Sequence, residues 1–183
     1  MPTAITKKEN SRRKEIRSFL EKIVIDAGVG RMSQMPNFEE KALVQVMSDL
    51  AAMSGQKSQI RRAKKSIAGF KIRENQVVGL RVTLRREKMV DFFERLITIV
   101  LPRVRDFRGI NRTAIDSHGV LTVGLRDQFV FPEIEAERSL TGFSYGVSIV
   151  PKIKNAARSW EEFTKLGVPM KKEDEKGKKK GKK

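Results

Sequence analysis

The sequence predicts an α+β fold, in which helices cover one face of a mostly antiparallel sheet and leave the other face open. Two observations predict it. Segments in which apolar and polar residues alternate, as in half-buried strands, are interspersed with segments whose apolar residues recur at helical spacing. The order of these segments is strand, helix, two strands, helix, two strands, helix, which favours antiparallel pairing. Such a sheet often exposes one face to solvent or a ligand.

Five segments show the period-two alternation of strands: residues 22–27, 66–73, 80–85, 121–128 and 145–150. Three segments show helical spacing: residues 37–55, 87–101 and 156–166. We predict that the first helix begins at an N-cap, Asn37, with Glu40 three residues later, and ends at Gly55. We expect Pro102 and Gly167 to end the other two helices. The methionine and aromatic residues of these helices are interpreted as core.

The chain is long enough for one domain with its own core, and we predict that residues 1–170 form it. Residues 171–183 contain eight lysines, three acidic residues and no apolar residue. This tail is predicted to be disordered, and either simply solvated or in loose contact with phosphates. The tail carries +5 of the formal charge of +17, so +12 remains for residues 1–170. We therefore expect a polyanionic partner.

The composition argues against an enzyme. The chain has no cysteine, which excludes disulfides, cysteine-ligated metals and thiol nucleophiles. Its only histidine, His118, lies in a turn beside Asp116 and Ser117, where the geometry of a catalytic triad cannot form. The acidic residues show no spacing typical of a two-metal site. We expect no cofactor, no metal and no small-molecule substrate. No apolar run reaches the roughly 18 residues of a membrane span, so we expect a soluble, intracellular protein without membrane contact.

Strand parity places polar side chains together on one face of the sheet. Val82 and Leu84 point to one side of their strand, which puts Arg81, Thr83 and Arg85 on the other side. In the first strand the same argument groups Lys22, Val24 and Asp26. On these residues alone, the face is either an ordinary solvated surface or a surface for a ligand.

Residues 57–73 form a basic run without any acidic residue. Its seven cations repel one another unless phosphates neutralise them. Phe70 in this run is either a core residue or an aromatic that stacks on a base or ribose. The candidate contact residues are Lys57, Arg61, Arg62, Lys64, Lys65, Phe70, Lys71 and Arg73.

Seven runs of residues together resemble the bacterial family of large-subunit ribosomal protein five. They are KIVIDAGVG (22–30), SGQK (54–57), AKKSIAGFKIR (63–73), VTLR (82–85), FFERLI (92–97), LPRVRDFRG (101–109) and FPEI (131–134). The order and approximate spacing are those of the family, and the resemblance covers about residues 20–150.

The resemblance implies a non-catalytic protein of the cytoplasmic large ribosomal subunit. It implies binding to 5S rRNA, contact with 23S rRNA and with the elbow of peptidyl-site tRNA, and a bridge to small-subunit ribosomal protein thirteen. It implies that four residues bind 5S rRNA: Asp26, Gln56, Thr83 and Arg85. It also implies that the loop around residues 61–76 reaches tRNA.

Several positions depart from the family pattern. Asp26 stands where the family has asparagine, Ser58 where it has proline and Arg86 where it has glycine, while residues 116–119 replace a glycine-richer turn. A carboxylate at position 26 only accepts hydrogen bonds, for example from a ribose 2′-hydroxyl, and repels phosphate.

The two alternative functions are an enzyme acting on RNA and a DNA-binding protein. A nuclease acting on RNA needs an acidic cluster or a histidine pair, and the sequence shows neither. A sequence-independent DNA-binding protein is distinguished by competition between structured rRNA and duplex DNA.

Overall fold

The computed structural model describes residues 4–135, 139 and 141–171, with side chains from residue 10 onward. Its five strands form one sheet, antiparallel throughout, in the order β2-β3-β1-β5-β4. The strands are β1 (Leu20–Gly28), β2 (Gln59–Arg62), β3 (Val77–Leu84), β4 (Leu121–Leu125) and β5 (Tyr145–Pro151). The predicted α+β fold class is confirmed.

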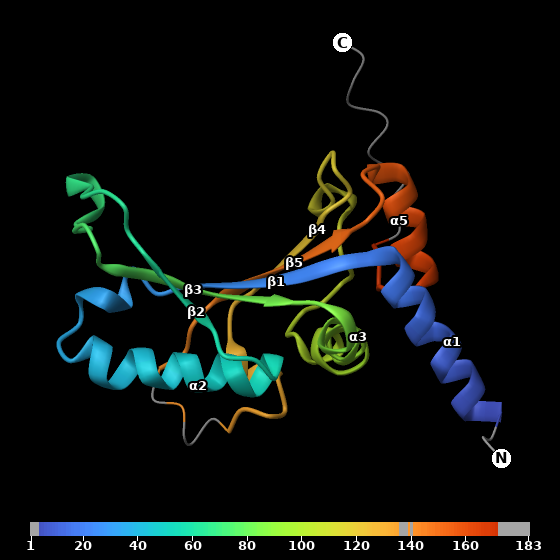
Figure 1. The fold of residues 1–183 in the computed structure, drawn as a ribbon, viewed down its shortest axis with the longest axis horizontal. Coiled ribbons are helices and arrows are strands. Elements are labelled where there is room, and N and C mark those ends of the chain that lie inside the picture. The colour runs from blue at the N-terminus through green and yellow to red at the C-terminus, as the bar shows by residue number, and fades with distance from the viewer. Residues whose placement is uncertain (1–3, 136–138, 140, 172–183) are drawn as a thin grey trace, which may run out of the picture.

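Helices cover one face of this sheet and one end of it. The α-helices are α1 (Ala4–Phe19), α2 (Leu43–Ser54), α3 (Arg86–Arg95), α4 (Leu101–Arg103) and α5 (Ala156–Lys165). The π-helical turns η2 (Phe38–Ala42) and η4 (Leu96–Val100) lead into α2 and α4, and the 3-10 turns are η1 (Met32–Gln34), η3 (Ala68–Phe70), η5 (Arg112–Ala114) and η6 (Gln128–Val130). In Figure 1, α2 and α3 lie on the same side of the sheet, while α1 and α5 lie at one end. None of the described helices covers the opposite face of the sheet, which is called the open face below.

The core lies between the sheet and the helices α2 and α3. Alternate strand residues such as Ile23, Ile25 and Leu84 are fully buried and meet the apolar stripes of the two helices. The buried residues of those stripes are Leu43, Val46, Leu50, Met53, Met89, Phe92, Phe93, Leu96 and Val100. Every stripe residue expected in the core of these two helices is therefore buried except Met47, which is half-buried.

Two helices end at the glycines predicted from the sequence, whereas the predicted capping of the first helix by Asn37 is not observed. Gly55 and Gly167 have positive φ angles and end their helices as expected. Asn37 stands at the N-cap position of the π-turn η2, but its φ of 57° is left-handed and its side chain makes no capping hydrogen bond. The chain enters α2 through the π-turn η2 instead, in which the Lys41 N–H donates to the Asn37 carbonyl. The second helix continues one residue past Pro102.

The predicted strand at residues 66–73 is wrong. The strand in this region is β2, which lies earlier in the basic run, and Ile67 and Ile72 form only an isolated bridge. A strand is interrupted there because η3 and the left-handed Lys71, with φ 53°, turn the chain back on itself. The strand predicted at 121–128 also ends early, since η6 begins at Gln128.

The sequence did not predict α1, which is held by side chains of α3 and α5. Arg13 of α1 pairs with Asp91 at 2.5 Å and with Glu94 at 2.9 Å, both on α3. Phe19 packs edge-on against Phe163 of α5, with ring centroids 5.1 Å apart. The predicted tail at 171–183 lies outside the described residues apart from Lys171.

Candidate nucleic-acid interface

The open face of the sheet carries polar and small side chains from all five strands. Asp26 is the cross-strand partner of Arg81, and Val24 is the partner of Thr83. Cross-strand partners point to the same face of a sheet. The residues between them, such as Ile25, are buried on the helix side. The predicted parity of the first strand and of β3 is therefore confirmed.

Asp26 and Arg81 form an ion pair on this face. Nε and Nη2 of Arg81 donate to the two carboxylate oxygens of Asp26, at 2.5 Å and 3.1 Å. This hydrogen bonding and the charge of Asp26 raise the pKa of Arg81 above its ordinary value. A two-pronged pair holds the planar guanidinium in one orientation. It also neutralises a carboxylate that would otherwise repel phosphate.

Gln56 reaches the same region from the end of α2. The buried Ser54 hydroxyl donates to the Leu50 carbonyl at 2.6 Å and accepts from the Gln56 N–H at 3.3 Å, so the turn after α2 is held in place. Gln56 Nε2 then donates to the Thr83 carbonyl at 3.3 Å. Two of the four predicted 5S rRNA-binding residues are thus adjacent.

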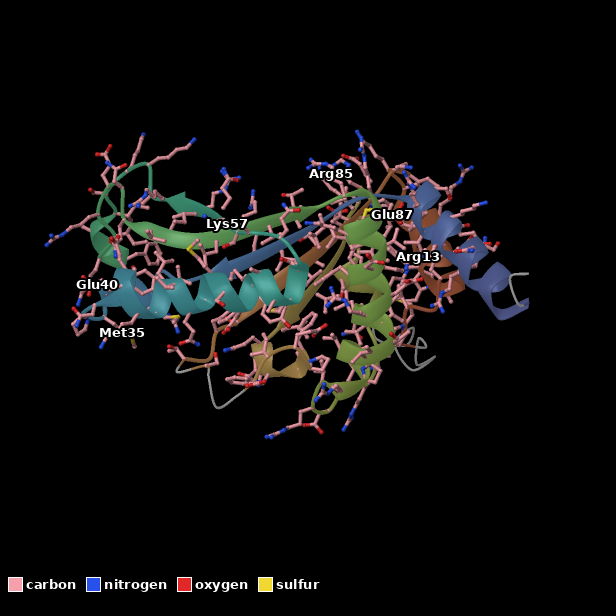
Figure 2. The ribbon with its side chains drawn as sticks, turned by 60° about the horizontal axis from the view of Figure 1, so that its bottom comes forward. Arg13, Met35, Glu40, Lys57, Arg85 and Glu87 are labelled. Carbon is pink, nitrogen blue, oxygen red and sulfur yellow. The ribbon has the colours of Figure 1, made fainter. Side chains whose placement is uncertain are left out.

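Arg85 extends the polar face to the start of α3. Its backbone is extended, with φ −141°, so it continues the alternation of β3, and its side chain is exposed. Figure 2 shows Arg85 beside the start of α3 and Lys57 along the edge of the sheet. The next residue, Arg86, has a φ of 55°. This left-handed conformation favours glycine.

The basic run forms a hairpin that projects from the end of the sheet (Figure 1). Beyond β2 and β3 the hairpin continues through backbone hydrogen bonds, such as Ala63 N–H to the Gln76 carbonyl at 2.9 Å. Gln76 Nε2 donates to Ser33 Oγ at 2.7 Å and so ties the base of the hairpin to the segment after β1. Eight predicted contact residues are exposed on it or just before it: Lys57, Arg61, Arg62, Lys64, Lys65, Phe70, Lys71 and Arg73.

Phe70 and Arg61 lie at different ends of the hairpin. Phe70 lies at the tip and is 72% exposed, so the interpretation of Phe70 as a core residue is wrong. Arg61 is the cross-strand partner of Gly79 and therefore lies on the open face of the sheet, not at the tip.

The half of the open face that β5 and β4 supply was not predicted from the sequence. Thr122 on β4 and Ser148 on β5 are cross-strand partners, with their hydroxyl oxygens 3.5 Å apart. Ser148 is also the partner of Val24, so this pair continues the row that begins at Thr83. Strand alternation in 145–150 places Ser148 opposite the buried Val147, but only the observed register brings it beside β1.

Acidic side chains of α3 are neutralised away from this face. Glu87, Asp91 and Glu94 pair with arginines of α1, and Figure 2 shows Arg13 facing α3 near Glu87. Among the described residues, no cluster of three or more acidic, histidine or cysteine side chains is arranged to hold a metal ion. In the same part of the chain, no helix is both long and apolar enough to cross a membrane.

Comparison with known proteins identifies similar chains. The family model described as ribosomal protein L5 matches residues 15–73, and a second model, which describes the C-terminus of the same ribosomal family, matches residues 77–170. A large ribosomal subunit protein uL5 of Chlorobaculum tepidum is 42% identical over 156 residues, which cover 85% of this chain and 83% of the relative. The uL5 protein of Rubrobacter xylanophilus is 46% identical over 153 residues, which cover 82% of each chain. That of Fusobacterium nucleatum is 42% identical, with coverages of 84% and 81%.

Proposed function

Because this chain belongs to the ribosomal protein L5 family, we propose that it binds 5S rRNA through the open face of its sheet. The family makes the chain a non-catalytic constituent of the cytoplasmic large ribosomal subunit, with rRNA as its partner. In the proposal, Asp26, Gln56, Thr83 and Arg85 form the centre of the 5S rRNA site, within one RNA-binding domain of residues 1–170.

The observation that supports this site most directly is the convergence of three predicted residues. Gln56 donates to the backbone of Thr83, and Thr83 and Arg85 are alternate residues of one extended segment. Their chemistry suits RNA: a guanidinium binds phosphate through two parallel hydrogen bonds, and a hydroxyl exchanges hydrogen bonds with a ribose 2′-hydroxyl. Thr83 and Arg85 face the side of the sheet that no described helix covers, and Gln56 is held beside them.

Asp26 acts in this proposal through its neighbour. Its carboxylate is already engaged by Arg81, so it does not meet phosphate itself, and it occupies hydrogen-bond donors of the guanidinium that RNA phosphates would otherwise use. Because both side chains remain more than two-fifths exposed, Arg81 keeps a surface available to RNA.

The hairpin is a second surface of the same function. We place the contact with 23S rRNA and with the elbow of peptidyl-site tRNA on it, because its cations and Phe70 are all exposed and the hairpin projects beyond the sheet. An exposed aromatic at the tip suits stacking on a base or ribose of tRNA. A bridge to small-subunit ribosomal protein thirteen is proposed from family membership.

A competition titration at moderate salt tests the proposal. The full chain is bound to labelled 5S rRNA and challenged with unlabelled 5S rRNA, a scrambled RNA of equal length, or duplex DNA with the same number of phosphates. We expect only 5S rRNA to displace the label at stoichiometric amounts. Equal displacement by the scrambled RNA and the duplex DNA would show binding by charge alone and overturn the assignment.

A further inference from the structure

Nothing in the part of the chain that the structure describes requires glycine at three positions on the open face. They are Gly28 at the end of β1, Gly124 in β4 and Gly146 in β5. A Cβ built on any of them meets no atom within 4 Å, and none has a positive φ angle. Glycine inside a strand costs conformational entropy and marks places where another backbone or a ligand approaches closely.

Gly79 provides the contrast on the same face. It is the cross-strand partner of Gly28, but a Cβ there would lie 3.2 Å from the Ala27 carbonyl oxygen. The fold itself therefore explains Gly79. It does not explain Gly124 and Gly146, which are partners of one another across β4 and β5.

Strand register places these two glycines next to the proposed RNA site. Gly146 is the partner of Asp26, so one row across the sheet reads Gln59, Arg81, Asp26, Gly146 and Gly124. The neighbouring row contains Thr83, Val24, Ser148 and Thr122. The half of the open face at β5 and β4 thus combines a glycine strip, Gly146 and Gly124, with the hydroxyls of Ser148 and Thr122. It lies directly beside the half that carries Arg81, which is called the arginine half below.

The chemistry of the face indicates which form of RNA fits. Sheets that bind single strands stack bases on exposed aromatic rings. The open-face positions of the five strands hold no aromatic residue. Double-helical RNA is recognised by its shape and by contacts to 2′-hydroxyls and phosphates across its shallow minor groove.

We infer that one part of the open face contacts the sugar-phosphate backbone of double-helical RNA; this inference rests on the proposed function. The contacting residues are Gly124, Gly146, Thr122 and Ser148. The glycines allow the backbone of the RNA to approach the sheet, and the two hydroxyls bind ribose 2′-hydroxyls. The arginine half of the face then binds phosphates of the same helix.

The test separates a role in binding from a role in folding. Gly124→Ala, Gly124→Val, Gly146→Ala and Gly146→Val are made in the full chain, with Ala52→Val on the exposed side of α2 as a control for added methyl groups. Thermal unfolding and affinity for 5S rRNA are measured for each. We expect unfolding temperatures equal to or above that of the wild type. Affinity should fall with side-chain size, by roughly 10-fold or more for valine, because hydrogen bonds to the displaced RNA are lost.

The outcomes are distinguishable. If the wild type fails to bind 5S rRNA, the proposed function fails and this inference with it. If the wild type and the glycine variants bind equally while Arg85→Ala binds weakly, the inference alone is wrong. A fall of more than about 4 °C in the unfolding temperature of both alanine variants would show that the fold needs these glycines, which also overturns it. Displacement of 5S rRNA by oligouridine as efficiently as by an RNA hairpin would contradict the preference for double-helical RNA.

Discussion

The carboxylate of Asp26 on β1 and the guanidinium of Arg81 on β3 meet across paired strands, with Nε and Oδ1 2.5 Å apart. The pair is in the middle of the row that runs from Gln59 on the edge strand to Gly124 on the opposite edge. The negative charge of Asp26 is thereby neutralised, and hydrogen-bond donors of Arg81 are occupied.

The first prediction concerns this pair. Asp26→Asn should release Arg81 and strengthen binding to 5S rRNA, and log affinity should depend more steeply on log salt, by roughly 0.7 to 0.9 for one added phosphate contact. The free energy of unfolding should change by less than about 1 kcal/mol, because the pair is partly exposed. Binding titrations at several salt concentrations measure the slope.

Glu39→Gln, at an exposed position before α2, is the control: it changes the charge equally and should leave the slope unaltered. Weaker binding by Asp26→Asn would contradict this prediction and would mean that the carboxylate supports binding, either by orienting Arg81 or by contacting RNA itself.

The second prediction uses the alternation along β3. Thr83→Val and Arg85→Ala should weaken 5S rRNA binding by about 5-fold to 150-fold, which corresponds to about 1 to 3 kcal/mol, and change stability by about 0.5 kcal/mol. Leu84→Ala should instead destabilise the fold by about 2 to 5 kcal/mol, because Leu84 is completely buried. Thermal unfolding and binding curves for the three variants check this. A stable Leu84→Ala that fails to bind, beside an unfolded Arg85→Ala, would show that the wrong face was assigned.

The third prediction concerns the hairpin tip. Lys64→Ser, Lys65→Ser and Phe70→Ala together should leave stability and 5S rRNA binding nearly unchanged, because all three side chains are exposed. Contact with peptidyl-site tRNA in assembled ribosomes should weaken, which chemical footprints on the tRNA elbow report. Arg61 and Arg62 are kept, since Arg61 lies on the open face and Arg62 donates to the Asn75 carbonyl within the hairpin. Unchanged footprints with lost 5S rRNA binding would show that the two surfaces had been exchanged.

The fourth prediction concerns alkaline pH. The Tyr145 hydroxyl is buried and has no hydrogen-bond partner among the described residues, and burial, with a smaller effect of the Asp127 charge, raises its pKa above the ordinary value. The folded state keeps this proton at pH values at which the unfolded state loses it. The stabilisation from keeping the Tyr145 proton is therefore fully present below about pH 10. As the pH rises further, the free energy of unfolding falls by up to about 1.4 kcal/mol per pH unit.

Urea unfolding of the wild type and of Tyr145→Phe between about pH 8 and pH 11 measures this effect. Absorbance of tyrosinate reports Tyr145 alone, because the chain has a single tyrosine. The variant should lack the additional alkaline slope and should be about 1 kcal/mol more stable at neutral pH, because no unpaired hydroxyl is then buried. Equal slopes in both proteins would contradict the assignment.

The sequence predicted the central strands and their orientation because burial there is one-sided. Ile23, Ile25, Val82 and Leu84 are all essentially inaccessible, so period-two alternation identified both the strands and their polar side. The same alternation misled at residues 66–73, where Ile67 and Ile72 face each other across a turn instead of following a strand. Local apolar spacing does not distinguish a tight hairpin tip from a short strand.

Features that depend on contacts between distant residues could not be predicted from the sequence. From residue 10 onward, the buried apolar residues of helix α1 are Ile16 and Phe19. Arg13 and Arg17 find their partners on α3, about 70 to 80 residues later, and Arg12 donates to the Leu166 carbonyl. The glycine strip arises only because β4 pairs with β5 and β5 pairs with β1. A glycine in a strand is recognised as unexplained only when its surroundings are known.

Site-specific photo-crosslinking tests the central claim, that the open face binds 5S rRNA. A photo-reactive phenylalanine analogue is placed either at Gln59, on the open face beside Arg81, or at Val44, which is 58% exposed on α2. After irradiation with 5S rRNA, the account predicts a crosslink from position 59 and none from position 44. A crosslink from position 44 with none from position 59 would place the RNA on the helical side of the molecule and contradict it.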